Sequence, residues 1–60
     1  MMKFKIKHLV FDKPSVVFEE TNPPEWLLAK EYKWWWDKYV KGLAVGKDIK
    51  SDFHRITRLE

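Results

Sequence analysis

The sequence contains no cysteine, only two glycines and three prolines, and no long hydrophobic run. The absence of cysteine excludes disulfide bonds and any zinc site with thiolate ligands. No segment approaches the ~18–20 apolar residues that a transmembrane helix needs. Lysines also interrupt the N-terminal segment where a secretory signal would have its apolar core. We therefore expect no membrane association and a cytoplasmic protein.

The chain is short and rich in aromatic residues. It has 60 residues, of which 45% are hydrophobic and 17% aromatic, with four tryptophans. This length predicts a single domain over residues 1–60, and such a domain buries only about 60% of the surface that its unfolded chain exposes. Small domains usually need disulfides, a metal or a partner chain. Without cysteine and with only two histidines, we expect dense aromatic packing and a homodimer instead.

The N-terminal third has the patterns of a β-hairpin. Residues 3–11 alternate between apolar residues and lysines, as a half-buried strand does. His8 lies on the apolar side of this strand, so we expect it to be partly buried. Residues 12–15 have the composition of a turn, and 15–20 form a second short apolar strand. The pattern therefore predicts an antiparallel hairpin over 3–20.

Residues 24–41 predict one long amphipathic helix. The segment has no glycine or internal proline, and its apolar residues recur with a period of 3.6. Asn22 and Glu25 have the spacing of a capping box, and Gly42, or alternatively Gly46, is suited to end the helix. The residues expected on its core face are Leu28, Ala29, Tyr32, Trp35, Trp36, Tyr39, Val40 and Leu43.

Residues 47–60 fit two different elements. Ile49, Phe53 and Ile56 recur at helical spacing, whereas the alternation in residues 52–59 is typical of a strand. We prefer the strand, because a hairpin alone is a marginal sheet and gains from a third strand. The predicted fold is a small α+β domain of order ββαβ, an antiparallel sheet with one long amphipathic helix packed on one face. The sheet residues expected beneath the helix are Phe4, Ile6, Val10, Val16 and Phe18.

Three consecutive tryptophans, at positions 34–36, cannot all lie on one helix face, because successive side chains point about 100° apart. Trp35 and Trp36 fall on the core face, whereas Trp34 falls beside Leu27 in a second apolar stripe flanked by lysines. Either another segment covers this stripe, or it contacts a second copy or a target protein. Tryptophan is enriched at binding hot spots. The candidate contact residues are Leu27, Lys30, Trp34, Lys38 and Lys41.

The basic side of the first strand is a second candidate surface. The net charge of +3 permits an acidic partner, and a basic sheet with aromatics can bind phosphates and stack on bases. The simpler interpretation is a solvated face whose lysines protect a sheet edge. Arg55 or Arg58 joins the lysines if the C-terminal strand pairs with the first. The candidate nucleic-acid-binding residues are Lys3, Lys5, Lys7, Arg55 and Arg58.

No arrangement of residues in the sequence supports catalysis. Asp52 and His54 share a strand face, but no nucleophile accompanies them, and the sequence has no glycine-rich phosphate loop. We expect no enzymatic activity and no cofactor or metal. The predicted function is a small protein-interaction module, a homodimeric phage-type or mobile-element protein that inhibits a host or defence protein in the host cytoplasm. The alternative is a nucleic-acid-binding module.

Overall fold

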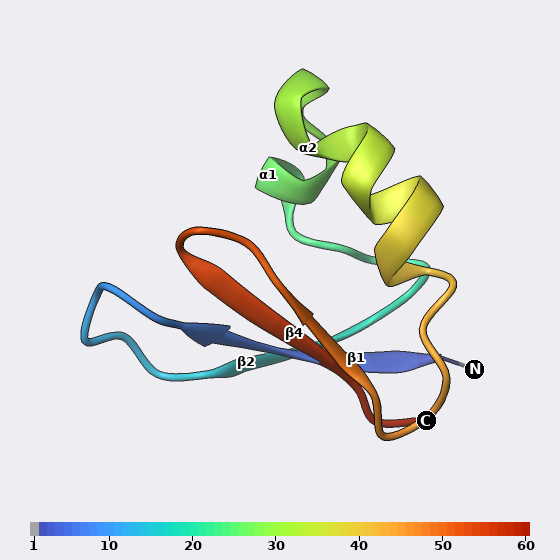
Figure 1. Ribbon diagram of the computed structural model, residues 1–60, viewed down its shortest axis with the longest axis horizontal. Helices are drawn as coiled ribbons and strands as arrows, with labels where there is room; N and C mark the ends of the chain where they lie inside the picture. The colour runs from blue at the N-terminus through green and yellow to red at the C-terminus, as the bar shows by residue number, and fades with distance from the viewer. Residues whose placement is uncertain (1) are drawn as a thin grey trace.

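A computed structural model, which describes residues 2–60, shows a four-stranded antiparallel sheet with helical segments on one face (Figure 1). In chain order the elements are β1 (Lys3–His8), β2 (Val16–Glu19), α1 (Glu25–Leu28), α2 (Lys30–Trp35), η1 (Trp36–Val40), β3 (Asp48–Lys50) and β4 (His54–Arg58). The strands are arranged as β2-β1-β4-β3. The predicted small α+β class with an antiparallel sheet is thus confirmed.

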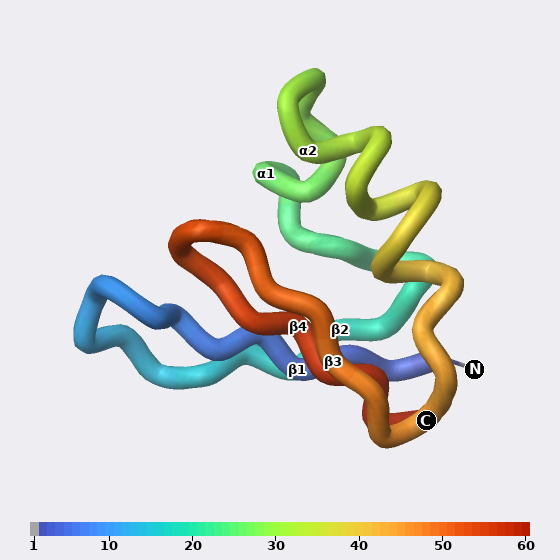
Figure 2. Tube along the Cα trace, in the orientation of Figure 1, coloured from blue at the N-terminus to red at the C-terminus, as the bar shows by residue number. Residues whose placement is uncertain are grey.

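The first and last strands lie side by side in the centre of the sheet. Phe4 in β1 opposes Phe18 in β2 on one side and Arg58 in β4 on the other. The trace in Figure 2 shows the consequence: the start of β1 and the end of β4 lie near each other at one end of the molecule. Opposed residues share a face of the sheet. The even-numbered residues of β1 therefore face the helices, and its lysines face away.

The C-terminal segment forms two strands instead of one. β4 confirms the strand that we preferred over a helix for residues 52–59. Ile49 lies in β3, directly opposite Ile56 in β4. β3 is only three residues long, with one apolar residue between two charged ones, so it has no alternation that a sequence pattern can reveal. The order of elements is accordingly ββαββ rather than ββαβ if the helical segments are taken together.

The predicted single helix over 24–41 is wrong. Ala29 has an extended backbone, with φ −65° and ψ 152°, which ends α1 and starts α2. α2 then continues into η1, a π-helical turn in which the Lys41 N–H donates to the Trp36 carbonyl at 3.0 Å. Neither glycine nor proline marks the break. We attribute it to packing, because one regular helix would place Leu27 and Trp36 on opposite sides, and here both are buried.

The hydrophobic core lies between the sheet and the helical segments. Phe4 stacks on Phe18 with ring centroids 5.4 Å apart, and Trp36 meets Phe4 edge-on at 5.4 Å. Such edge-to-face and offset-stacked pairs are the preferred aromatic geometries. Dense aromatic packing therefore forms the centre of the core. The buried hydrophobic residues are Phe4, Ile6, Phe18, Leu27, Trp35, Trp36, Val40 and Ile56.

Several residues expected in the core are exposed instead. Leu28 and Tyr39 were predicted on the core face of the helix but are exposed. The break at Ala29 and the π-helical turn change the direction of their side chains relative to one regular helix. Val10 lies beyond the end of β1, and Val16 begins β2, at the end of the hairpin where both are exposed. The helical segments cover only part of the sheet.

Candidate partner-binding surfaces

The expected stripe of Leu27 and Trp34 does not exist, because Leu27 is buried. Its exposed fraction is 0%. Its backbone N–H donates to the Pro24 carbonyl at 3.0 Å within the turn that forms α1. The extended backbone of Ala29 separates α1 from α2, so Leu27 does not follow the face pattern of one continuous helix. Its side chain packs into the core. Leu27 is therefore no longer a candidate contact residue.

Trp34 lies on the surface in contact with Tyr39. Their exposed fractions are 59% and 44%. The two rings meet edge to face, with centroids 5.8 Å apart and an interplanar angle of 79°. The Nζ atom of Lys38 lies 5.8 Å from the centre of the Tyr39 ring. We call Trp34, Lys38 and Tyr39 the aromatic surface. The sequence pattern missed Tyr39, because a regular helix assigns it to the core face.

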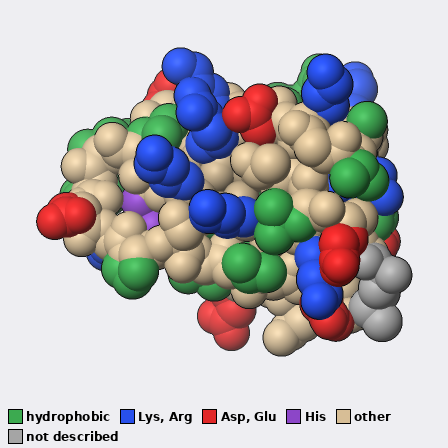
Figure 3. All heavy atoms as spheres, turned by 90° about the horizontal axis from the view of Figure 1, so that it is seen from below, with side chains coloured by type: hydrophobic (Ala, Val, Ile, Leu, Met, Phe, Trp, Pro, Cys, Tyr) green, Lys and Arg blue, Asp and Glu red, His purple; other side chains and the backbone are tan. Residues whose placement is uncertain are grey.

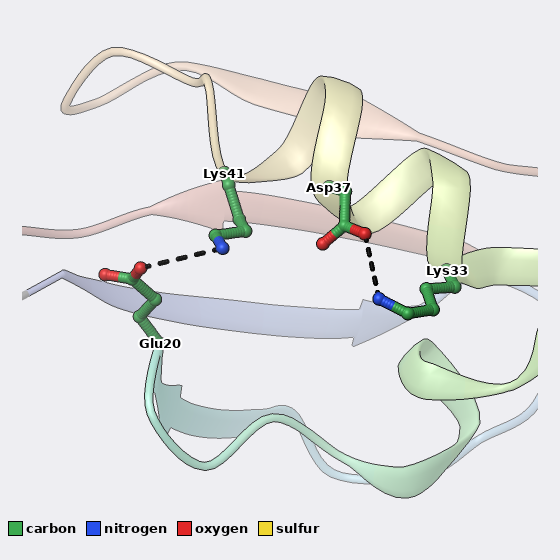
Figure 4. A network of polar contacts seen from close by, with 4 residues as sticks. All are labelled: Glu20, Lys33, Asp37 and Lys41. Carbon is green, nitrogen blue, oxygen red and sulfur yellow. Dashed lines mark hydrogen bonds and ion pairs between the residues drawn. The ribbon is translucent and has the colours of Figure 1, made fainter.

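The lysines predicted around Trp34 lie in two different places. Lys30 precedes Trp34 by one turn of α2, so both side chains lie on one side of that helix. The Nζ atom of Lys41, in contrast, lies 3.9 Å from Glu20 Oε1, and Figure 4 shows these side chains pointing toward each other. Lys41 therefore links the end of η1 to the segment after β2. It does not belong to the aromatic surface.

Charges of both signs lie near the aromatic surface, because Glu31 as well as Lys30 lies within one turn of Trp34 in α2. Lys33 and Asp37 form an exposed ion pair, with 3.0 Å between Nζ and Oδ2 (Figure 4). Within residues 2–60, no acidic side chain forms an ion pair with Lys30 or Lys38. These two lysines keep their charge available to a partner. An acidic surface on that partner would complement them.

The outer face of the sheet, turned away from the helices, carries four of the five predicted nucleic-acid-binding residues. Lys7 opposes Arg55 across β1 and β4. Figure 3 views the molecule from the side of the sheet and shows Lys and Arg side chains spread over it, with hydrophobic and acidic side chains between them. Phe4 and Phe18 face the helices instead. The four residues are Lys3, Lys5, Lys7 and Arg55.

Ion pairs neutralise part of this outer face. Lys3 Nζ lies 3.5 Å from Glu60 Oε2. Arg55 Nε lies 3.5 Å from Asp48 Oδ2. Lys5 and Lys7 have no acidic partner in the part of the chain that the structure describes. Lys50 opposes Arg55 on the same face and also has no acidic partner among the described residues. Three lysines of this face are therefore unpaired, which lets it neutralise only a few phosphates.

Arg58 lies on the opposite face from these lysines. It opposes Phe4 across β1 and β4, so its side chain starts on the helix side of the sheet. Its Nη1 donates to the Leu43 carbonyl at 2.7 Å, and its Nε donates to the Glu60 carbonyl at 3.0 Å. The bond to Leu43 connects β4 to the segment that follows η1. Arg58 holds the fold together and does not extend the outer face.

Two histidines meet on the helix side, at the far end of β1 and β4. His8 opposes His54, and their ring centroids are 5.0 Å apart. Trp26 stacks on His54 at 4.2 Å with an interplanar angle of 20°. Burial, followed by the charges of His8 and Lys13, lowers the pKa of His54, and its Nδ1 is buried without a hydrogen-bond partner. The sequence analysis missed this pair, because the strand register was needed to bring the two histidines together.

A shallow hollow of about 370 Å³ lies beside β2. It is lined by Lys3, Val17, Phe18, Glu19 and Asn22. Across residues 2–60, no three or more histidine, aspartate or glutamate side chains come together as metal ligands do. In the same residues, none of the helices has the length and apolar character needed to traverse a bilayer.

Comparisons with protein-family models, with curated proteins and with solved structures find no match to this chain. Its function is therefore argued from its own surfaces.

Proposed function

We propose that this protein is a non-enzymatic interaction module that binds an acidic protein through the aromatic surface. The observation that supports this proposal is the exposure of Trp34 and Tyr39 as a contacting pair on a chain whose other tryptophans pack inward. A rigid aromatic pair offers a large contact area at little cost in conformational entropy. Lys30 and Lys38 add charges that favour acidic partners.

A narrower form of the proposal comes from the sequence alone. A chain of only 60 residues is suited to block a larger protein by binding to it, so the target would be a host or defence protein that this chain inhibits. Nucleic-acid binding through the outer face is the alternative. It is supported by Lys5 and Lys7 lying together without acidic partners among the described residues, and weakened because Phe4 and Phe18, the aromatic residues of β1 and β2, face the helices instead.

The test compares target capture by the wild-type chain and by a Trp34→Ala variant, from lysate treated with nuclease. We expect the variant to stay folded, because Trp34 is exposed, and to bind the captured protein at least ~30-fold more weakly, as truncation of a hot-spot tryptophan does. Lys38→Glu should weaken the same interaction. Phe11→Ala is the matched control, since Phe11 is 58% exposed but lies in the β1–β2 connection.

Two results would contradict the proposal. One is a captured protein that binds Trp34→Ala and Phe11→Ala equally well. The other is a partner that disappears with nuclease treatment and with Lys5→Glu but not with Trp34→Ala, which would favour the nucleic-acid alternative. Strong salt dependence, with a slope of roughly −0.9 per phosphate contacted, would accompany the second result.

A further inference from the structure

The two edges of the sheet differ in how they are protected against pairing with another strand. β3 forms one edge and is short, with Asp48 and Lys50 on either side of a single apolar residue. β2 forms the other edge and begins with Val16 and Val17, which are 46% and 57% exposed. Short, charged edge strands resist edge-to-edge pairing, whereas apolar ones favour it. β2 is the edge that is open to an additional strand.

The backbone of β2 presents unpaired groups at this edge. The Glu20 N–H donates to the Met2 carbonyl at 3.0 Å, which extends the β1–β2 ladder by one hydrogen-bonded pair. Because such pairs alternate along an antiparallel ladder, the even-numbered residues of β2 bond to β1. The N–H and C=O groups of Ser15 and Val17 therefore point away from the sheet. Within residues 2–60, no other backbone group bonds to them, and the hollow beside Val17 leaves space there.

We propose that this edge binds the same edge of a second copy of the chain, so that two β2 strands pair antiparallel and the sheets join into one. Centred on Val16, the pair lets Ser15 and Val17 of each copy exchange hydrogen bonds with Val17 and Ser15 of the other. The two Val16 side chains then cover each other on the helix side. This interface does not involve the aromatic surface, so the inference goes beyond the proposed function and does not depend on it.

The charges along β2 select a second copy in antiparallel orientation. Lys13 precedes the strand, and Glu19 ends it. Antiparallel pairing centred on Val16, continued past the start of β2, brings Lys13 of each copy next to Glu19 of the other. Parallel pairing would place like charges opposite each other, which is unfavourable. Each chain therefore carries both halves of a complementary site.

Sedimentation of the full chain over a range of micromolar concentrations tests the proposal. We expect the wild-type chain to form a dimer. The dimer dissociation constant of a Val17→Pro variant should be at least tenfold higher than that of the wild type. Proline is suited to this position because the N–H it removes faces away from β1, so the ladder within one chain stays intact. Circular dichroism and melting of the dilute variant check that it remains folded.

A charge reversal provides a test that does not depend on proline. We expect Lys13→Glu and Glu19→Lys to weaken the dimer individually and the double reversal to restore it, because each opposed pair then regains opposite charges. Trp34→Ala should leave the dimer unchanged, which separates this interface from the proposed target surface. A wild-type chain that is monomeric at every concentration would overturn the proposal. So would a dimer that survives Val17→Pro and both single reversals.

Discussion

Adjacent residues in this protein occupy very different environments, and the three tryptophans at 34–36 are the clearest case. Trp34 is exposed, whereas Trp35 and Trp36 are buried against the sheet and the preceding turn. The 100° step between helical residues predicted this division, because the three residues span the junction of α2 and η1 without a break. Helix geometry alone is therefore sufficient to predict which of these three adjacent side chains are buried.

Leu27 and Leu28 provide a matched prediction at this scale. Leu27→Ala should destabilise the fold by about 2–5 kcal/mol, because it removes a fully buried side chain from the core and leaves a cavity. Leu28→Ala removes the same atoms from a side chain that is 47% exposed, so its effect should be well below that range. Urea unfolding of both variants measures the difference. Equal losses of stability would show that Leu27 is not part of the core.

The sequence pattern failed at Leu27 because its position depends on contacts made far along the chain. Measured from Trp26 along one regular helix, Leu27 falls outside the core face together with Trp34. In the structure, the extended backbone at Ala29 separates the two, and Leu27 packs into the core while Trp26 stacks on His54. The stack of Trp26 on His54 depends on β4, and the core around Leu27 includes residues of β1, β2 and β4, which are all outside the helical segments. Burial of large side chains outweighs the helix propensity of Ala29.

How well each secondary structure element could be predicted depends on how much pattern its sequence contains. β1 and β4 alternate clearly between two faces, and both were predicted as strands. β1 was predicted over 3–11 and ends at His8, and β4 was predicted over 52–59 and spans His54–Arg58. β3 has three residues and no recognisable alternation. The π-helical turn of η1 has the same residue types as a regular helix, yet it redirects Tyr39 to the surface. Short elements and local irregularities thus account for the parts of the fold that the sequence did not predict.

The two glycines give an experiment on these connections. Gly46 has φ 84°, whereas Gly42 does not have a positive φ, so the helix ends without a left-handed glycine. Gly46 instead lies inside the turn before β3, in which the Lys47 N–H donates to the Ala44 carbonyl at 3.0 Å. Gly46→Ala should cost about 1–2 kcal/mol of stability, because a Cβ disfavours that backbone conformation. At Gly42 an added Cβ makes only ordinary contacts, with the Lys38 carbonyl at 3.6 Å and the Tyr39 carbonyl at 3.8 Å.

Denaturant unfolding of the two glycine variants should therefore rank them clearly. The free energy of unfolding of Gly42→Ala is expected to be close to that of the wild type or slightly higher, since the substitution reduces the conformational freedom of the unfolded chain. Gly46→Ala is expected below both. The reverse ranking would mean that Gly42, as the sequence suggested, is the residue that needs the special conformation.

The molecule as a whole is a small sheet whose helical segments cover it unevenly. The core lies beneath η1 and α1, while the β1–β2 end of the hairpin and the β2 edge remain open. Sequence composition predicted a need for self-association, but the edge available for it appears only once the strand order is known. In the same way, His8 and His54 become neighbours only through the pairing of β1 with β4. Surfaces made by non-local pairing are the part of a site that a single sequence does not reveal.

The histidine pair makes the stability of the whole molecule depend on pH. His54 contacts His8 from β1 and Trp26 from α1, and the charge of Lys13 in the segment before β2 also acts on it. Burial first, and then the two neighbouring positive charges, lower the pKa of His54 below its usual 6.5. Between these two pKa values the unfolded chain binds more protons than the folded one, so stability rises with pH. The contribution of His54 to stability is fully present above about pH 6.5 and is lost as the pH falls toward the lowered pKa.

Urea midpoints measured from about pH 8 down to about pH 5, above the range in which ordinary carboxylates titrate, should therefore decrease. His54→Gln removes the titrating group and should flatten most of this decrease. His8→Gln removes one neighbouring charge but leaves His54 partly buried and stacked against Trp26, so it should flatten the curve less, because burial is the first cause of the lowered pKa. If His54→Gln loses stability as steeply as the wild type over this range, another group controls the pH dependence, and the packing of Trp26 on His54 does not disfavour the charged imidazole.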